Sequence, residues 1–241
     1  MAGHLSLDPR LNLTVLPDPA ACARWLAATL HERLSAAVAA RGAAHLLLSG
    51  GSTPDPLFRL WGAPPGETLA LPEGVHLWWV DERFVPPGHS EHNATRALAL
   101  MNNAVSPERV HVMPSEGDPE TAAAHYGREI VRHLGKEGWW DGILLGLGGD
   151  GHTASLFPGS PLEHEATHRV MVATSPTGQT RLTLTPPSLK CSRGSFLWVA
   201  GESKRSVLRG FLENPACCPA GWVLPEGGLL EVVADQGAWP L

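Results

Sequence analysis

Residues 143–158 read Ile-Leu-Leu-Gly-Leu-Gly-Gly-Asp-Gly-His-Thr-Ala-Ser-Leu-Phe-Pro, and this segment is the most informative part of the chain. The segment begins as a short apolar run and passes into glycines, a pattern typical of a buried strand followed by a sharp turn. Asp150 and His152 lie on that turn. In open parallel sheets, ligands bind at the carboxyl ends of the strands. Because an imidazole accepts a proton near neutral pH, we expect His152 to be a general base.

The alternation of strands, loops and helices predicts the fold class. Four apolar runs are followed directly by polar or glycine-rich loops: residues 44–48, 75–80, 143–147 and 195–200. Helices are expected where an aspartate that can act as an N-cap precedes a proline, at Asp18 and Asp118. Two further runs, 170–173 and 181–185, read as short strands. We therefore expect an α/β fold with a mainly parallel sheet and a small antiparallel addition, in a single domain over residues 1–241.

Composition limits the classes of function. The chain has 241 residues, of which 43% are hydrophobic and 17% charged, so a large core is expected and disorder is not. The formal net charge of −6 argues against nucleic-acid binding. No apolar run approaches the length of a membrane span, and residues 1–10 lack the pattern of a signal peptide. The four cysteines match neither a zinc site nor a C-x-x-C motif, which favours reduced thiols in a cytoplasmic protein.

A candidate phosphate loop follows the first of the four apolar runs. Ser49, Gly50, Gly51, Ser52 and Thr53 come directly before a proline at which a helix is expected to begin. A strand, a loop of small residues and a helix can together present backbone N–H groups to a phosphate. The loop matches neither the Walker motif nor G-x-G-x-x-G, and a plain tight turn is an alternative interpretation.

Two cations are expected at the same edge of the sheet. Arg83 ends the charged triplet Asp81-Glu82-Arg83, which we expect to form a loop after residues 75–80 and which could equally be a solvated turn. Lys204 lies in the first turn of the helix expected after residues 195–200. A cation there is unfavourable with respect to the helix dipole, and a bound anion would account for it. Arg83 and Lys204 are therefore candidate phosphate ligands.

For the other polar residues near these loops we expect structural roles. No G-x-S-x-G nucleophile elbow is present, and Ser155 is expected to help cap the turn after His152. Direct attack by water is therefore favoured over a covalent intermediate. The pair His89-x-x-His92 lacks the carboxylate or cysteine that would complete a metal site, so no metal is expected. Asn93 is expected to cap the next helix.

Four motifs in this sequence resemble those of the 6-phosphogluconolactonase family. They are Ser-Gly-Gly-Ser-Thr-Pro at 49–54, Asp-Glu-Arg-Phe-Val-Pro at 81–86, Gly-Gly-Asp-Gly-His-Thr-Ala-Ser-Leu-Phe-Pro at 148–158 and Arg-Leu-Thr-Leu-Thr at 181–185. The resemblance implies a three-layer modified Rossmann-like fold, shared with glucosamine-6-phosphate deaminase and ribose-5-phosphate isomerase. It also implies hydrolysis of 6-phosphoglucono-δ-lactone in the oxidative pentose phosphate pathway, without a metal or organic cofactor.

The resemblance also implies roles for individual residues. His152 would be the general base that activates water, and Asp150 would orient this loop or the imidazole. Residues 49–53 with Lys204 would hold the phosphate. Arg83 and Arg181 would complete the site, one or both on the phosphate or one on the oxyanion. The implied partner is a small phosphorylated sugar lactone, with no nucleic acid or membrane, and the chain would be a monomer or a small homo-oligomer.

Two alternatives remain open from the sequence. The first is a deaminase or isomerase acting on an amino-sugar phosphate, which would share the phosphate loop and the histidine. Deaminases used for comparison carry Ile-Ala-Phe-Asn-Glu-Pro after the histidine, whereas this chain has Thr-Ala-Ser-Leu-Phe-Pro, with no acidic residue before Pro158. The second is a sugar-phosphate sensor without catalysis, which the acidic charge and the absence of a DNA-binding segment disfavour.

Overall fold

The computed structural model describes residues 8–64, 69–102, 104–136 and 138–240. Part of the segment used to predict that no signal peptide is present, residues 1–7, lies outside this range. The α-helices are α1 (Pro19–Arg41), α2 (Asp55–Trp61), α3 (Asn93–Leu100), α4 (Pro119–Leu134), α5 (Pro186–Lys190) and α6 (Arg205–Glu213). The strands are β1 (Leu11–Leu16), β2 (Ala44–Leu48), β3 (Val75–Trp79), β4 (Asp81–Arg83), β5 (Val110–His111), β6 (Gly142–Gly146), β7 (Val170–Thr174), β8 (Thr180–Leu184), β9 (Ser195–Val199) and β10 (Leu230–Asp235).

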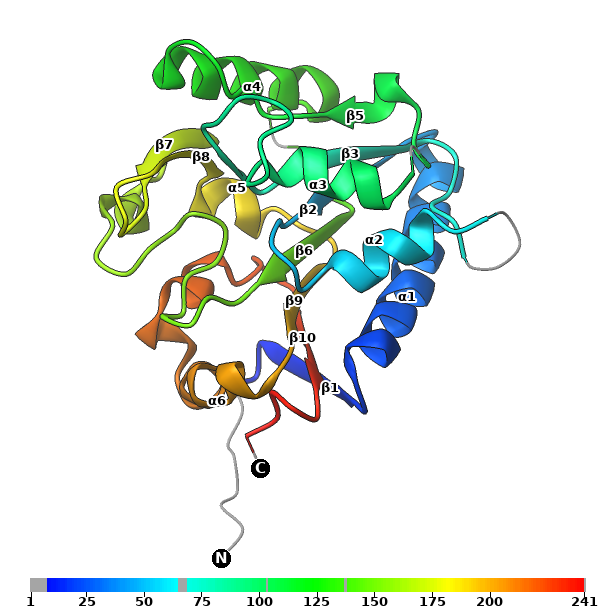
Figure 1. The fold of residues 1–241 in the computed structure, drawn as a ribbon, viewed down its shortest axis with the longest axis vertical. Coiled ribbons are helices and arrows are strands. Elements are labelled where there is room, and N and C mark those ends of the chain that lie inside the picture. Colours follow the sequence, from blue (N-terminus) through cyan, green and yellow to red (C-terminus); the bar gives the residue numbers. More distant parts are fainter. Residues whose placement is uncertain (1–7, 65–68, 103, 137, 241) are drawn as a thin grey trace, which may run out of the picture.

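A parallel sheet of seven strands forms the middle layer, in the order β1-β10-β9-β6-β2-β3-β5. Helices α1, α2 and α3 pack on one face of this sheet, and α4, α5 and α6 on the other (Figure 1). A second sheet of three antiparallel strands, β4-β8-β7, is the small addition. The expected three-layer α/β fold with a mainly parallel sheet and an antiparallel addition is confirmed.

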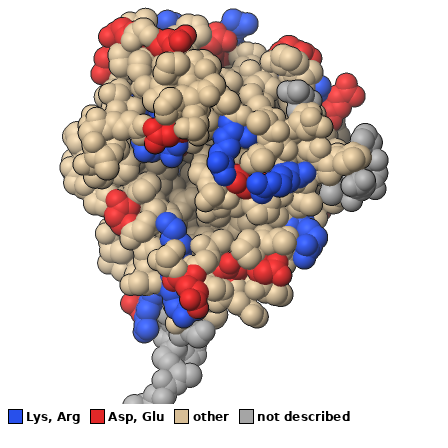
Figure 2. All heavy atoms as spheres, in the orientation of Figure 1, with Lys and Arg blue, Asp and Glu red and all other residues tan. Residues whose placement is uncertain are grey.

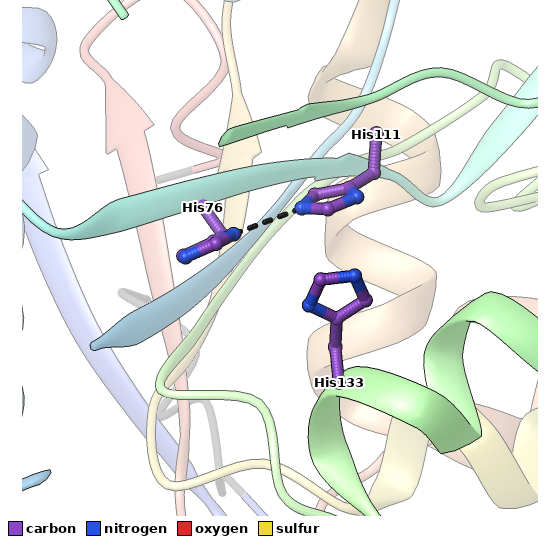
Figure 3. Close-up of side chains that lie close together, drawn as sticks. All are labelled: His76, His111 and His133. Carbon is purple, nitrogen blue, oxygen red and sulfur yellow. Dashed lines mark hydrogen bonds between the residues drawn. The ribbon is translucent and has the colours of Figure 1, made fainter. Parts of the chain in front are cut away.

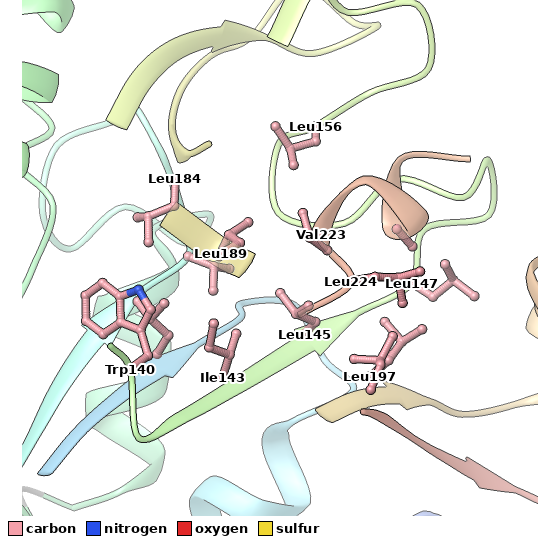
Figure 4. Close-up of a cluster of buried hydrophobic side chains, with 14 of the residues drawn as sticks. Trp140, Ile143, Leu145, Leu147, Leu156, Leu184, Leu189, Leu197, Val223 and Leu224 are labelled. Atoms are coloured by element: carbon pink, nitrogen blue, oxygen red, sulfur yellow. The ribbon is translucent and has the colours of Figure 1, made fainter. Parts of the chain in front are cut away.

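Strand β6 shows how the sequence builds both cores. Alternate side chains of a strand point to opposite faces of the sheet. Ile143 and Leu145 accordingly join the core beneath α4, α5 and α6, while Leu144 joins the core beneath α1, α2 and α3. Figure 4 shows Ile143, Leu145 and Leu147 in line along this segment, packed against Leu197 and Leu224. The parts of a strand that are buried on both faces are therefore apolar, which explains the continuous apolar runs in the sequence.

The first helix begins and ends where the sequence predicts. Asp18 adopts an extended backbone, and its carboxylate accepts a hydrogen bond of 2.7 Å from the N–H of Ala21. Gly42 ends the helix with φ of 80°, and its N–H donates to the carbonyl of Val38 at 2.7 Å. None of the helices in the described ranges is both long enough and apolar enough to cross a membrane.

Two local predictions were wrong. Asp81-Glu82-Arg83 is not a loop but strand β4, which leaves the parallel sheet after β3 and pairs with β8. The N-cap of α3 is His92 and not Asn93, since His92 Nδ1 accepts from the N–H of Thr95 at 3.2 Å. Both differences have one cause: Glu82, which is buried, accepts hydrogen bonds from the N–H groups of Asn93 and Ala94 at 2.7 and 2.9 Å. This contact fixes the start of α3 against β4.

Candidate active site

A cleft of about 320 Å³ opens at the carboxyl ends of β2, β6 and β9. Nine of the ten predicted site residues line it: His152, Ser49, Gly50, Gly51, Ser52, Thr53, Arg83, Arg181 and Lys204. The tenth predicted residue, Asp150, is hydrogen-bonded to His152. Figure 2 shows a hollow near the middle of this face with Lys and Arg side chains around it. The fold therefore brings together residues that the sequence places more than 150 positions apart.

The carboxylate of Asp150 holds the imidazole of His152. The distance between Asp150 Oδ1 and His152 Nδ1 is 2.5 Å, and the backbone N–H of His152 donates to the same oxygen at 3.1 Å. Partial burial raises the pKa of Asp150, but these hydrogen bonds outweigh it and leave the pKa below its usual value. Asp150 therefore stays ionised and fixes the proton of the ring on Nδ1. His152 Nε2 is left with the lone pair that a base requires.

Two glycines allow the His152 loop to take its shape. The loop is closed by backbone hydrogen bonds from Gly148 to the carbonyl of His152 at 2.7 Å and from Gly151 to the carbonyl of Gly148 at 3.1 Å. A Cβ atom on Gly148 would lie 2.1 Å from His152 Nδ1, so any side chain there would displace the imidazole. Gly151 has φ of +84°, and a Cβ atom on it would lie 2.4 Å from the Cβ of Cys218. The backbone must be glycine at both positions for the ring to stand where it does.

The C-terminal part of the chain supports this loop, a contact that could not be predicted from the sequence. Cys218 is buried against Gly151, and the N–H of Ala220 donates to the carbonyl of Gly151 at 3.1 Å. The ring of Phe157 packs on the imidazole, with its centroid 4.9 Å from that of His152. The loop therefore rests on the segment around residue 218, and its imidazole rests on an aromatic ring.

The predicted phosphate loop presents backbone donors to the cleft. Gly51 has φ of 84°, which turns the chain between β2 and α2. Within the described residues, the N–H groups of residues 50–53 donate no hydrogen bond to another part of the chain. The hydroxyl oxygen of Ser49 is buried and also lacks a partner among these residues. Polar groups left unpaired beside a cleft are suited to binding a polar ligand.

Arg83 and Arg181 lie directly opposite each other in the antiparallel sheet. They are cross-strand partners in the β4–β8 pairing, and both line the cleft. Like charges in this arrangement are destabilising unless something lies between them. Burial, and then the proximity of Arg83, lower the pKa of Arg181, while Asp81 acts in the opposite direction. The Nε atoms of both arginines are buried without a partner in the described structure. The pair is therefore suited to an anion.

Lys204 contributes the third cation. It lies at the end of the turn Glu202–Lys204 and directly precedes α6. No hydrogen bond or ion pair joins its ammonium group to the described part of the chain, although Glu202 nearby pairs with Arg205. Its position at the start of α6 is the predicted one and is unfavourable with respect to the helix dipole, while anion binding there stays a prediction.

A buried network behind the cleft was missed from the sequence. The hydroxyl of Ser155 does not cap its own turn; it donates to Asp81 Oδ2 at 2.6 Å, and both residues are buried. The N–H of Ser155 donates to Thr183 Oγ1 on β8 at 3.2 Å. Arg181 Nη1 lies 3.8 Å from the same carboxylate oxygen of Asp81. The network therefore links the loop that carries His152 to the strands that carry the two arginines.

The pair His89 and His92 is not arranged as a metal site. His92 is buried, its Nδ1 accepts from the N–H of Thr95 and its Nε2 lies 3.2 Å from the hydroxyl of Ser115. Both ring nitrogens are therefore engaged in the fold. Burial lowers the pKa of His92, which fits a neutral ring in this capping role.

The fold and the cleft define an α/β protein in which a histidine, hydrogen-bonded to a carboxylate, lies on a cleft with three cations. The chain matches, over residues 17–232, the family described as glucosamine-6-phosphate isomerases/6-phosphogluconolactonase, and it belongs to that family. The 6-phosphogluconolactonase of a Synechocystis species is 37% identical over 215 residues, which cover 85% of this chain and 87% of the relative. That of Treponema pallidum is 33% identical, covering 94% and 95%. The structure of 6-phosphogluconolactonase from Trypanosoma cruzi superposes with a TM-score of 0.83 at 27% identity, covering 98% and 97%.

Proposed function

We propose that this chain is a 6-phosphogluconolactonase, which hydrolyses 6-phosphoglucono-δ-lactone to 6-phosphogluconate in the oxidative pentose phosphate pathway. The observation that carries the proposal is the Asp150–His152 pair, joined at 2.5 Å, on a cleft that also contains three cations. The curated relatives named as 6-phosphogluconolactonases, which align with most of the chain, support the choice of substrate.

In the proposed reaction, His152 acts through Nε2 as the general base. It takes a proton from a water molecule as the water oxygen bonds to the lactone carbonyl carbon. The bond from that carbon to the ring oxygen then breaks, and the imidazolium returns the proton to the departing oxygen. Asp150 stabilises the imidazolium between these two steps, because its carboxylate lies against Nδ1.

The cations and the loop 49–53 would bind the charged parts of the substrate. Lys204 and the free N–H groups of the loop lie on the same cleft and would hold the phosphate. Arg83 and Arg181 would share the phosphate or stabilise the negative charge that develops on the carbonyl oxygen. One donor to such an oxyanion typically contributes about 10²–10³ in rate.

The residue before Pro158 separates this proposal from the deaminase alternative. Phe157 stands where the deaminases used for comparison carry a glutamate, and its ring packs on His152. An apolar ring there cannot relay a proton.

The proposal also includes three further properties of the enzyme. It needs no metal or organic cofactor, it acts in the cytoplasm, and it is a monomer or a small homo-oligomer.

The test is a comparison of the wild-type chain with His152→Ala. We expect the wild type to hydrolyse the phosphorylated lactone well above the spontaneous rate, and to prefer it to unphosphorylated gluconolactone. His152→Ala should lose about 10²–10⁴ in kcat, the usual contribution of a general base, and should still bind 6-phosphogluconate. The exposed His164 provides the control, and His164→Ala should be as active as the wild type. Turnover of glucosamine 6-phosphate without lactone hydrolysis would contradict the proposal.

A further inference from the structure

Four histidines cluster at the edge of the sheet opposite the active-site cleft. His45 and His76 are the second residues of β2 and β3 and are partners in the β2–β3 register, so they lie near the amino ends of these strands. His111 on β5 pairs with Trp78 of β3 and shares the same face. His133, in the last turn of α4, reaches this face from the helix above. The proposed catalytic function uses none of them.

Three of these side chains point toward one another. One nitrogen from each of His76, His111 and His133 lies within 4.8 Å of the others (Figure 3). His76 Nδ1 and His111 Nε2 are 2.9 Å apart. Two nitrogens bound to one tetrahedral zinc are about 3.3 Å apart, given Zn–N bonds of about 2.0–2.1 Å. Small rotations of the side chains would therefore bring all three nitrogens to bonding distance of one ion.

We propose that His76, His111 and His133 bind a divalent transition-metal ion of the zinc type. Imidazole nitrogen suits zinc, copper and nickel, whereas magnesium and calcium prefer oxygen ligands. At present His76 and His111 share a hydrogen bond, in which one proton joins the two nitrogens. On binding, the donor ring releases this proton to solvent and takes one up on its other nitrogen, so that both facing nitrogens offer a lone pair to the metal ion. Three histidines leave a fourth position for water in a tetrahedral site.

Neighbouring groups hold the rings in place. The indole of Trp78 stacks on His111 with centroids 3.8 Å apart and an angle of 10°, and its Nε1 donates to His45 Nδ1 at 3.1 Å. Glu129 Oε2 lies 3.9 Å from His133 Nε2, one turn back on α4. A carboxylate near a ligating histidine is a common outer partner in metal sites. The site would thus be largely formed before the ion arrives.

Charge and access also suit a cation. The carboxyl end of α4 favours positive charge near His133. Glu108 and Glu129 lie nearby and partly offset Arg109 and Arg132, whose charges act on His76 and His111. The three ligand side chains are partly exposed, and a cleft of about 470 Å³ lined by His45, His133 and Asp141 adjoins them. An ion can therefore reach the site from solvent.

The test is calorimetric titration of the untagged, EDTA-treated chain with Zn²⁺. We expect one ion per chain, and binding at least about tenfold weaker in His76→Ala, His111→Ala and His133→Ala, since each removes one of three ligands. His125→Ala is the matched control, because His125 is exposed on the same helix as His133, and it should bind as the wild type does. Co²⁺ bound in place of Zn²⁺ should give visible absorption bands that these three variants lose.

Other outcomes would overturn the proposal. Absence of stoichiometric Zn²⁺ binding would do so, as would unchanged affinity in His111→Ala. Loss of the ion in His152→Ala, with the three variants unaffected, would place the metal in the active-site cleft instead. Circular dichroism without metal checks that each variant folds. His133→Gln, at the end of α4, keeps the test decisive if His111→Ala does not fold.

Discussion

Ser155 and Asp81, 74 residues apart in the chain, are joined by a buried hydrogen bond of 2.6 Å between the serine hydroxyl and the aspartate carboxylate. Asp81 belongs to β4, next to Arg83, and Ser155 follows the loop of His152. The bond therefore connects the loop of His152 to the strand that carries Arg83. The contribution of this bond to the stability of the fold can be measured by removing the hydroxyl of Ser155.

Ser155→Ala should lower the free energy of unfolding by about 1–3 kcal/mol, because it leaves a buried carboxylate without one of its donors. Denaturant-induced unfolding measures this. Ser90 is exposed, so Ser90→Ala should change the stability little. Equal stability of the two variants would mean that the bond contributes nothing to the fold.

Asp150→Asn should reduce kcat on the order of 10²-fold or more while leaving KM nearly unchanged, because the amide cannot stabilise the imidazolium as a carboxylate does. Steady-state kinetics measure both parameters. A variant with wild-type kcat would remove Asp150 from the proposed mechanism.

Lys204→Ala should raise KM for the phosphorylated lactone and reduce the preference over unphosphorylated gluconolactone, with a smaller effect on kcat. The reason is that the ammonium group would bind the phosphate, far from the bond that breaks. Lys136 is exposed away from the cleft and provides the control Lys136→Ala. An unchanged preference for the phosphorylated substrate would exclude Lys204 from the phosphate site.

Glu82 should make stability depend on pH. Burial raises its pKa to about 7 from 4.5, although three backbone N–H groups act in the opposite direction. The folded state then binds the proton more tightly than the unfolded state, so the associated stability is fully present below pH 4.5 and is lost as the pH rises through about 7. Unfolding measured across this range should show a shallower decline in Glu82→Gln, which does not titrate. The control Glu116→Gln should lose stability with pH as the wild type does. If Glu82→Gln showed the same loss, groups other than Glu82 would be responsible for the pH dependence of stability.

EDTA should leave lactone hydrolysis unchanged even if it removes an ion from the His76 site. That site is at the amino ends of the strands, whereas the cleft is at their carboxyl ends. Assays before and after chelation measure the effect. A loss of activity that Zn²⁺ restores would show that catalysis depends on a metal.

Most of the fold could be predicted because its signals are local. Asp18 and Gly42 bound α1, and the apolar runs of β2, β6 and β9 are strands buried on both faces. β4 could not be predicted, since Asp, Glu and Arg in succession are typical of a solvated turn. Their charges are tolerated because their partners, Ser155, the start of α3 and Arg181, come from distant parts of the chain.

The sequence predicts which loops form the candidate site, but not how their side chains are arranged. Parallel strands bring the residues after β2, β6 and β9 to one edge, so their convergence follows from the fold class. Arg83 and Arg181 reach the cleft by a different route, as opposed residues in the second sheet. The support from Cys218 depends on packing that no local pattern reveals. Gly151 is the residue in the sequence that reflects this packing, because a Cβ atom there would meet the Cβ of Cys218.

The pairing of β1 with β10 bears on how the molecule folds during its synthesis. The strand nearest the start of the chain is hydrogen-bonded to the last strand, and the loop of His152 rests on residues 218–220. Contacts of such long sequence separation form late and slow the folding of a domain. In a nascent chain that has emerged only as far as β9, β1 lacks its partner and the loop of His152 lacks the residues on which it rests. We therefore expect this loop to reach its final position only after residues 218–220 have emerged.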